Sequence, residues 1–215
     1  MSRSEAVGAD AGDGDPLALA LFGLTVVSGL IDAVSYLGLG HVFAANMTGN
    51  VVVIGFGLAG APGFSVLGST TALAAFLLGA ALAGRLTAGR LRPALAAECV
   101  LHLAAAAVVF AAGTGGAVQY GVIALLALAM GLRNATVRSL GVPDLTTTVL
   151  TMTLTGLAAE PRSPRRRRRV LAALTMLAGV VPGSVLVLHG QGGWALVAAG
   201  ALTAATGVLL RGRPS

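Results

Sequence analysis

One carboxylate stands alone inside a long apolar run. Asp32 lies in the stretch Gly-Leu-Ile-Asp-Ala-Val-Ser-Tyr-Leu at residues 29–37, with no basic residue nearby. A charged group inside a membrane span is energetically costly, so such groups usually face a cavity or a polar partner and serve function. We predict that Asp32 takes up and releases a proton during transport. The alternative is a neutral acid, hydrogen-bonded to Ser28, Ser35 or an opposite helix, that serves packing alone.

A polar cluster follows Asp32 in the sequence Asn-Met-Thr-Gly-Asn, residues 46–50. Asn46 and Thr48 are residue types that cap helix amino termini. The free N–H groups at such a terminus favour an anion or a carbonyl oxygen. We expect residues 40–45 to run extended to mid-membrane and residues 47–60 to return as a helix. The alternative is a set of polar turns at the membrane surface, joining short tilted spans.

An altered copy of both motifs appears about one hundred residues later. It begins Gly-Leu-Arg-Asn-Ala-Thr at residue 131 and places Asn134 where the first copy has Asp32. An amide keeps the hydrogen bonding of the acid and loses its charge. The sequence therefore predicts one substrate or ion pathway shared by the two copies. Its expected members are Asp32, Asn46, Thr48, Asn50, Asn134, Asp144, Thr146, Thr147 and Thr148.

The composition places these motifs in a membrane protein. Of the 215 residues, 56% are hydrophobic and only 10% are charged, whereas soluble domains carry roughly a quarter charged residues. Apolar stretches of about 18–25 residues, long enough to cross the hydrocarbon layer, recur along the chain. The net charge of +6 comes with arginine and no lysine. The positive-inside rule explains that charge better than a nucleic-acid partner, which we do not expect.

Eight apolar segments follow a polar tail, residues 1–16, which we predict to be disordered and cytoplasmic. The second and sixth segments, residues 47–60 and 144–159, are short for a spanning helix. If all eight spanned, the arginine-rich loops 85–92 and 162–169 would fall on opposite faces. If the two short segments re-enter instead, every arginine-rich loop falls on one face, which favours six spans. The six long segments are 17–39, 64–84, 93–112, 117–140, 170–188 and 194–210.

The predicted fold is therefore an all-α integral membrane protein with about six transmembrane helices and two short re-entrant or broken segments. Residues 17–211 form a single polytopic domain with repeat halves 17–113 and 117–211. Three spans per half is an odd number, so the halves must insert upside down relative to each other, as in many secondary transporters. Both termini are then cytoplasmic. The alternative is eight ordinary spans in two parallel halves.

The remaining charged residues are interpreted as structural. Arg133 lies at a different depth from Asp32, and we expect it to snorkel to the cytoplasmic surface. Glu98, Cys99 and His102 share one helix face near the inner end of their span, where an interfacial position is expected rather than a metal site.

Five consecutive arginines follow the sixth apolar segment. Between two apolar segments such a run is expected to fix the topology and to contact anionic lipid headgroups. No sequence motif of an enzyme is present: the chain has no phosphate-binding loop, no His-Glu-x-x-His and no nucleophile elbow. We expect neither a catalytic residue nor a cofactor. The five arginines are Arg165, Arg166, Arg167, Arg168 and Arg169.

These motifs resemble the YoaK family of small bacterial inner-membrane proteins, whose function is unknown. The matching pieces lie at residues 29–37, 42–50, 130–135 and 142–148, and the similarity runs from about residue 20 to 210. Family members usually carry Gln at the position of Arg133. The resemblance implies a multi-spanning plasma-membrane protein, commonly drawn with six helices, and it implies no substrate.

Two functions agree with the sequence. The first is a secondary transporter or channel for an unknown small solute, proton-coupled through Asp32, in the bacterial inner membrane. The second is a non-transporting membrane scaffold or assembly protein. A cavity between the two halves would favour transport, and a solid bundle would favour the scaffold. An oligomer is compatible with both.

Overall fold

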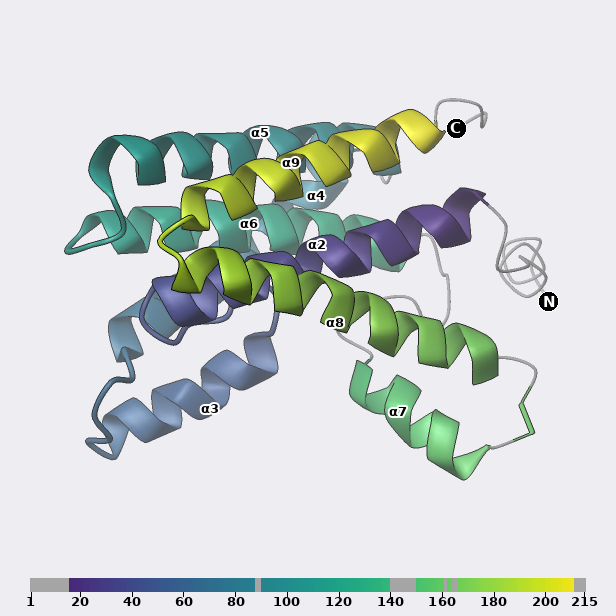
Figure 1. The fold of residues 1–215 in the computed structure, drawn as a ribbon, viewed down its shortest axis with the longest axis horizontal. Coiled ribbons are helices and arrows are strands. Elements are labelled where there is room, and N and C mark those ends of the chain that lie inside the picture. Colours follow the sequence, from purple (N-terminus) through teal and green to yellow (C-terminus); the bar gives the residue numbers. More distant parts are fainter. Residues whose placement is uncertain (1–15, 88–89, 140–149, 161, 164–165, 211–215) are drawn as a thin grey trace.

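The part of the chain that the computed structural model describes is helical and contains no strand (Figure 1). Two of its helices are short, α3 (Met47–Leu58) and α7 (Leu150–Ala159). Six others are long and apolar enough to cross a membrane, which confirms the predicted all-helical membrane fold. The described residues are 16–87, 90–139, 150–160, 162–163 and 166–210. The long helices are α2 (Pro16–Gly38), α4 (Val66–Thr87), α5 (Leu91–Ala112), α6 (Val118–Ser139), α8 (Arg166–Leu188) and α9 (Gly192–Leu209).

Most helix limits fall within a few residues of those expected. Among the long helices the start of α8 differs most, since the helix begins at Arg166 and not at residue 170. Arginine is a good helix former, so the basic run continues the helix past the apolar segment. Pro16, expected in the polar tail, is the first residue of α2, a position that suits its fixed φ. The rest of that tail lies outside the described residues.

Large apolar side chains cover the outer helices. Leu67, Leu77 and Leu78 on α4 are more than half exposed, as are Leu174 and Leu177 on α8. Contiguous apolar surface of this kind is rare on a monomeric soluble protein, and lipid is its natural surrounding. α2 and α6 differ from the other long helices because most of their apolar length is buried inside the bundle.

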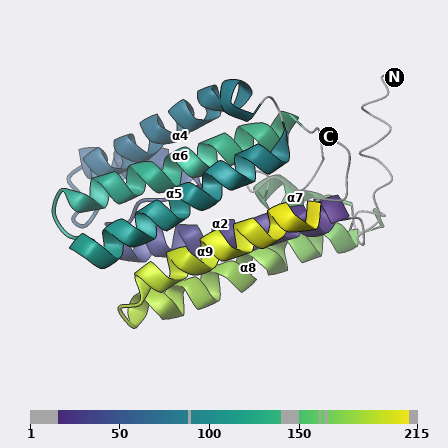
Figure 2. The same ribbon diagram turned by 90° about the horizontal axis from the view of Figure 1, so that it is seen from above.

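The helices pack in pairs that match between the two halves of the chain (Figures 1 and 2). α2 packs along α8 as α6 packs along α4, and α5 packs on α6 as α9 packs on α2. The short helices follow the same pattern, because α3 packs on α4 and α7 packs on α8. Exchanging the first four helices with the last four therefore leaves these pairings unchanged.

The two central crossings are close because glycines stand at both. A Cβ atom at any of the four positions would overlap the backbone of the facing helix. Lipid gives helices no hydrophobic reason to associate, so close contact between small residues supplies much of the attraction. The four glycines are Gly29 on α2, Gly179 on α8, Gly131 on α6 and Gly79 on α4.

The short helices lie beside the long helices, start partway along the length of the bundle and run toward its opposite ends (Figure 1). α3 returns to the end where α2 finishes. The loops before and after α3 meet there, since His41 Nδ1 lies 2.9 Å from the carbonyl oxygen of Gly63. α7 runs toward the other end, where a short connection leads to α8. Neither helix crosses the full length of the bundle.

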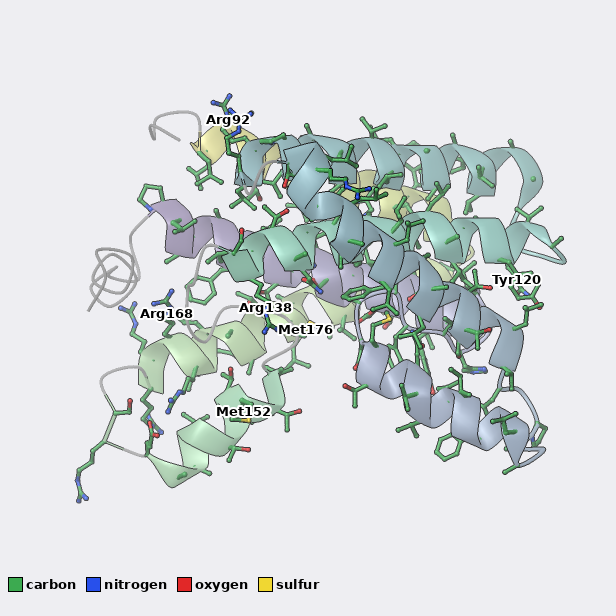
Figure 3. The ribbon with its side chains drawn as sticks, turned by 180° about the vertical axis from the view of Figure 1, so that it is seen from behind. Arg92, Tyr120, Arg138, Met152, Arg168 and Met176 are labelled. Carbon is green, nitrogen blue, oxygen red and sulfur yellow. The ribbon has the colours of Figure 1, made fainter. Side chains whose placement is uncertain are left out.

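The described arginines gather at one end of the bundle, with Arg133 as the exception. Figure 3 shows Arg92 and Arg168 at this end and Tyr120 at the opposite one. The start of α2 and the end of α9 lie at the arginine-rich end as well (Figure 1). This is the charge distribution that six spans require and that eight spans would split.

Gly131→Ala is expected to lower the melting temperature of the purified protein in detergent by several degrees. The new Cβ would overlap the Phe76 carbonyl group on α4, and overpacking costs about 1–3 kcal/mol. Gly121→Ala is the matched control on the same helix, because nothing lies within 4 Å of its Cβ. The control should melt at or above the parent temperature, since alanine favours helix. Equal melting of the two variants would contradict the close crossing.

Candidate functional site

A cavity of about 610 Å³ lies beside Asp32. Its walls come from both halves of the chain: α2, α3 and the loop between them from the first half, and α7 and α8 from the second. The volume lies within the range of small-molecule pockets, about 300–1,000 Å³. The polar side chains that line it are Asp32, Tyr36, Asn46, Thr48, Thr151 and Ser184.

Asp32 holds the non-helical loop between α2 and α3. The side chain is 6% exposed, and its Oδ1 accepts a hydrogen bond from the Ala45 N–H at 2.8 Å. One turn along α2, the Ser35 hydroxyl oxygen accepts from the Ala44 N–H at 3.1 Å. Backbone that leaves a helix within an apolar bundle must find such partners, because lipid offers none. Asp32 therefore has a structural role as well as a place in the cavity wall.

The amino terminus of α3 is fixed by two asparagines. Asn46 is the helix N-cap, and its side chain accepts from the Gly49 N–H at 3.1 Å, as its residue type predicted. Asn50, one turn into the helix, reaches back to the loop. Its Oδ1 accepts from the Phe43 N–H at 2.9 Å, and its Nδ2 donates to the Phe43 carbonyl oxygen at 2.6 Å. α3 therefore begins beside Asp32, with its first turn in the cavity wall.

The structure brings three of the predicted pathway residues to this cavity: Asp32, Asn46 and Thr48. Asn50 is fully buried, is hydrogen-bonded to the backbone of the loop and does not line the cavity. Asn134 lies on α6, away from the residues that line the cavity. Four predicted members lie outside the described residues: Asp144, Thr146, Thr147 and Thr148.

Sequence reasoning missed Thr151 and Ser184. Thr151 lies in the first described turn of α7, and Ser184 lies on α8 directly after Gly183. A hydroxyl within an apolar segment could have indicated a cavity-lining residue. Most described threonines, however, donate a hydrogen bond to a carbonyl oxygen of their own helix. The periodicity of a segment does not distinguish a hydroxyl that bonds within its own helix from one that faces a cavity, because the packing of the neighbouring helix determines which of them faces a cavity.

Arg133 forms a buried ion pair that the sequence did not predict. The side chain is 1% exposed, and its Nη1 lies 3.0 Å from Glu98 Oε1 on α5. Nη1 also donates to the Leu24 carbonyl oxygen at 3.1 Å, and Nη2 donates to the Ser28 hydroxyl, both on α2. The expected snorkelling of Arg133 to the surface is therefore wrong. Once Glu98 offers a partner, an inward position satisfies both charges.

The same packing corrects the expectation for the face of α5. Glu98 and His102 are fully buried and not interfacial, with His102 Nε2 3.9 Å from Glu98 Oε1. Within the described ranges, no three residues of the types His, Cys, Asp and Glu are grouped as a metal site requires. The pair Glu98–Arg133 joins the first half of the chain to the second, and Arg133 adds hydrogen bonds to α2.

Arg169 also departs from its expected position at the lipid headgroups. It is 7% exposed, and its Nη1 donates to Glu160 Oε2 at 2.9 Å. The first turn of α8 is thereby tied to the end of α7. Arg166 and Arg167, earlier in the run, are exposed.

Comparison with known proteins agrees with this architecture. Residues 20–209 match the family described as "Protein of unknown function (DUF1275)". The chain belongs to this family. It is also 32% identical over 145 residues to the "UPF0700 transmembrane protein YoaK" of Bacillus subtilis (strain 168). That alignment covers 64% of each chain, so it spans less than two thirds of the relative's length. No solved structure matches the chain.

The family membership confirms the resemblance that the motifs around Asp32 and Asn134 indicated. It also agrees with the six long apolar helices of the fold in describing a multi-pass membrane protein. The family carries no assigned activity, so the chemistry of this chain has to be argued from its own residues.

Arg133→Met is expected to destabilise the protein by about 3–5 kcal/mol, because Glu98 is left buried without its cation. Adding Glu98→Gln in the same chain should recover most of that loss. Folded yield on size-exclusion chromatography in detergent and the melting temperature measure both effects. Arg138→Met is the matched control, since Arg138 is an exposed arginine near the end of the same helix. A double variant whose loss equals the sum of the single losses would contradict the ion pair.

Proposed function

We propose that this protein is a secondary transporter for a small solute, with Asp32 in the binding site and proton coupling through its carboxyl group. The observation that carries the proposal is the cavity of about 610 Å³ beside Asp32. A scaffold needs only a solid bundle, whereas here both halves of the chain contribute walls to one cavity that contains a carboxylate. A carboxylate inside a membrane span is a recurrent feature of proton pathways.

The arrangement of the short helices supports an inverted repeat. α3 and α7 run in opposite directions along the bundle, toward its two ends (Figure 1), and the helix pairings are unchanged when the two halves are exchanged. Transporters built from inverted repeats bind solute near the membrane midplane, where interrupted helices from both repeats meet. The first turn of α3 and residues Leu150 and Thr151 of α7 meet at this cavity.

By the positive-inside rule, the arginine-rich end supports an orientation in which both termini lie on the cytoplasmic side of a bacterial inner membrane. The exposed Arg166 and Arg167 would then contact anionic headgroups. Alternating access requires the cavity to open first to one face and then to the other. The short helices α3 and α7 are the natural moving parts, because each packs mainly on one long helix, α3 on α4 and α7 on α8.

A non-transporting scaffold remains the second candidate, because one observation favours it. The buried pair of Arg133 and Glu98 fastens the two halves together inside the bundle. In a transporter this pair would act as the fixed axis about which other helices move. In a scaffold it would hold a rigid body that presents its outer faces to partners.

Asp32→Asn is expected to reduce solute-driven proton flux to the level of empty liposomes. The amide cannot ionise but keeps an oxygen for the Ala45 N–H, so the loop and the folded yield should survive. The measurement uses proteoliposomes that contain a pH-sensitive dye, challenged with panels of amines, amino acids, sugars and organic acids. Any solute that moves protons with the parent protein is then tested on the variant.

Glu160→Gln is the matched control for that experiment, because it makes the same chemical change at an exposed site outside the cavity. It should keep the parent flux. Unchanged flux in Asp32→Asn would show that the Asp32 carboxyl group does not couple proton movement to solute movement. No flux with any solute, from protein that elutes as a single folded species, would favour the scaffold.

A further inference from the structure

The charge of the cavity has one sign. Among the described residues that line it, Asp32 is the one acidic side chain, and none is Lys, Arg or His. A carboxylate buried in a membrane protein normally has a cationic or hydrogen-bonding partner. The Ala45 N–H supplies one hydrogen bond to Oδ1. A proton or a cation that enters the cavity can balance the rest of the negative charge.

The charged groups around Asp32 do not fill that role. Arg133 on α6 interacts electrostatically with Asp32, but its guanidinium is held by Glu98, Ser28 and the Leu24 carbonyl group. It is not among the residues that line the cavity. The described cavity-lining residues of α3, α7 and α8 carry no charge. On α2, the one titratable side chain that lines the cavity besides Asp32 is the Tyr36 phenol.

The remaining walls are aromatic and aliphatic. Tyr36 and Phe43 both line the cavity and are stacked, with ring centroids 4.6 Å apart and an interplanar angle of 27°. Aromatic faces attract ammonium groups through their quadrupole. Leu154, Met176 and Val180 add apolar surface from α7 and α8. Such walls suit hydrocarbon substituents, whereas small metal cations are bound by shells of oxygen ligands.

We propose that this cavity binds a small organic cation, an amine or quaternary ammonium with apolar substituents, with its charged nitrogen against the Asp32 carboxylate. The proposal deepens the proposed function and rests on it, because it names the solute class of the same site. One carboxylate carries one negative charge, so a proton and the cation compete for it. Binding of the cation to the protonated acid releases that proton, and rebinding of a proton releases the cation, which makes the process an exchange.

The test is isothermal titration calorimetry on the purified full-length protein in detergent. The probes are benzyltrimethylammonium and tetraethylammonium, because the charge of a quaternary ammonium does not change with pH. At least one should bind, and its affinity should fall as the pH is lowered. The affinity should fall by about tenfold per pH unit once most of the Asp32 carboxyl groups are protonated in the absence of the cation. Benzyl alcohol, benzoate and sodium chloride are the neutral, anionic and inorganic comparisons and should give no binding.

Two variants show whether the binding is at Asp32. Asp32→Asn should abolish ammonium binding, while Glu160→Gln should leave it unchanged. Tyr36→Leu keeps the carboxylate and removes one aromatic face, so it should weaken binding by about two- to thirtyfold, the range of a cation–π contact. This second variant keeps the proposal testable if Asp32→Asn does not fold.

Several results would overturn the cation site. They are no heat from either ammonium probe, binding that survives in Asp32→Asn, affinity that does not change with pH, or binding of benzoate, benzyl alcohol or sodium in place of the ammonium probes. Flux of another solute class without ammonium binding would overturn this inference and leave transport in place. Ammonium binding without flux in proteoliposomes would contradict the proposed transport function but would support the cation site.

Discussion

The hydrogen bond from the Ala45 N–H to the Asp32 carboxylate is the constraint on which the rest of the site depends. The chain leaves α2 and turns back inside a bundle whose surroundings offer no water to its backbone groups. Asp32, Ser35 and Asn50 together supply the missing partners to Ala45, Ala44 and Phe43. Because the loop is held in this way, α3 begins beside Asp32, and its first turn and Asp32 line the same cavity.

The interior therefore has fixed and movable parts. Close glycine crossings join α2 to α8 and α4 to α6, and the buried pair of Arg133 and Glu98 joins α6 to α5 and reaches α2. The short helices are held less deeply: most of α3 and α7 is exposed to the surroundings. A central frame with two lightly held helices beside a cavity is what an alternating-access mechanism requires.

Much of this architecture could be predicted from the sequence, because segment length and arginine placement depend on the lipid and not on packing details. Asp32, Asn46 and Thr48, which line the cavity, could be picked out because polar residues stand out within apolar runs. The pair of Arg133 and Glu98 was missed because the direction of a long side chain depends on which helices become neighbours. The distance along one helix suggested snorkelling, while the adjacent α5 supplied a nearer partner. The sequence also could not show the partner of Asn50. Only the folded loop shows that the Asn50 side-chain amide is hydrogen-bonded to the backbone of Phe43.

The loop before α3 and the loop after it lie at the same end of the bundle, and the first turn of α3 lines the same cavity as Asp32. The most direct test changes Cys99 to Ser, places single cysteines at His41, Ala61 or Ser163, and labels intact cells with an impermeant thiol reagent. His41 and Ala61 flank α3, and Ser163 precedes α8 at the arginine-rich end. We expect labelling at positions 41 and 61 in intact cells, and labelling at position 163 only after permeabilisation. Labelling of His41 and Ala61 from opposite faces would mean that α3 spans the membrane, and the account of the cavity would be wrong.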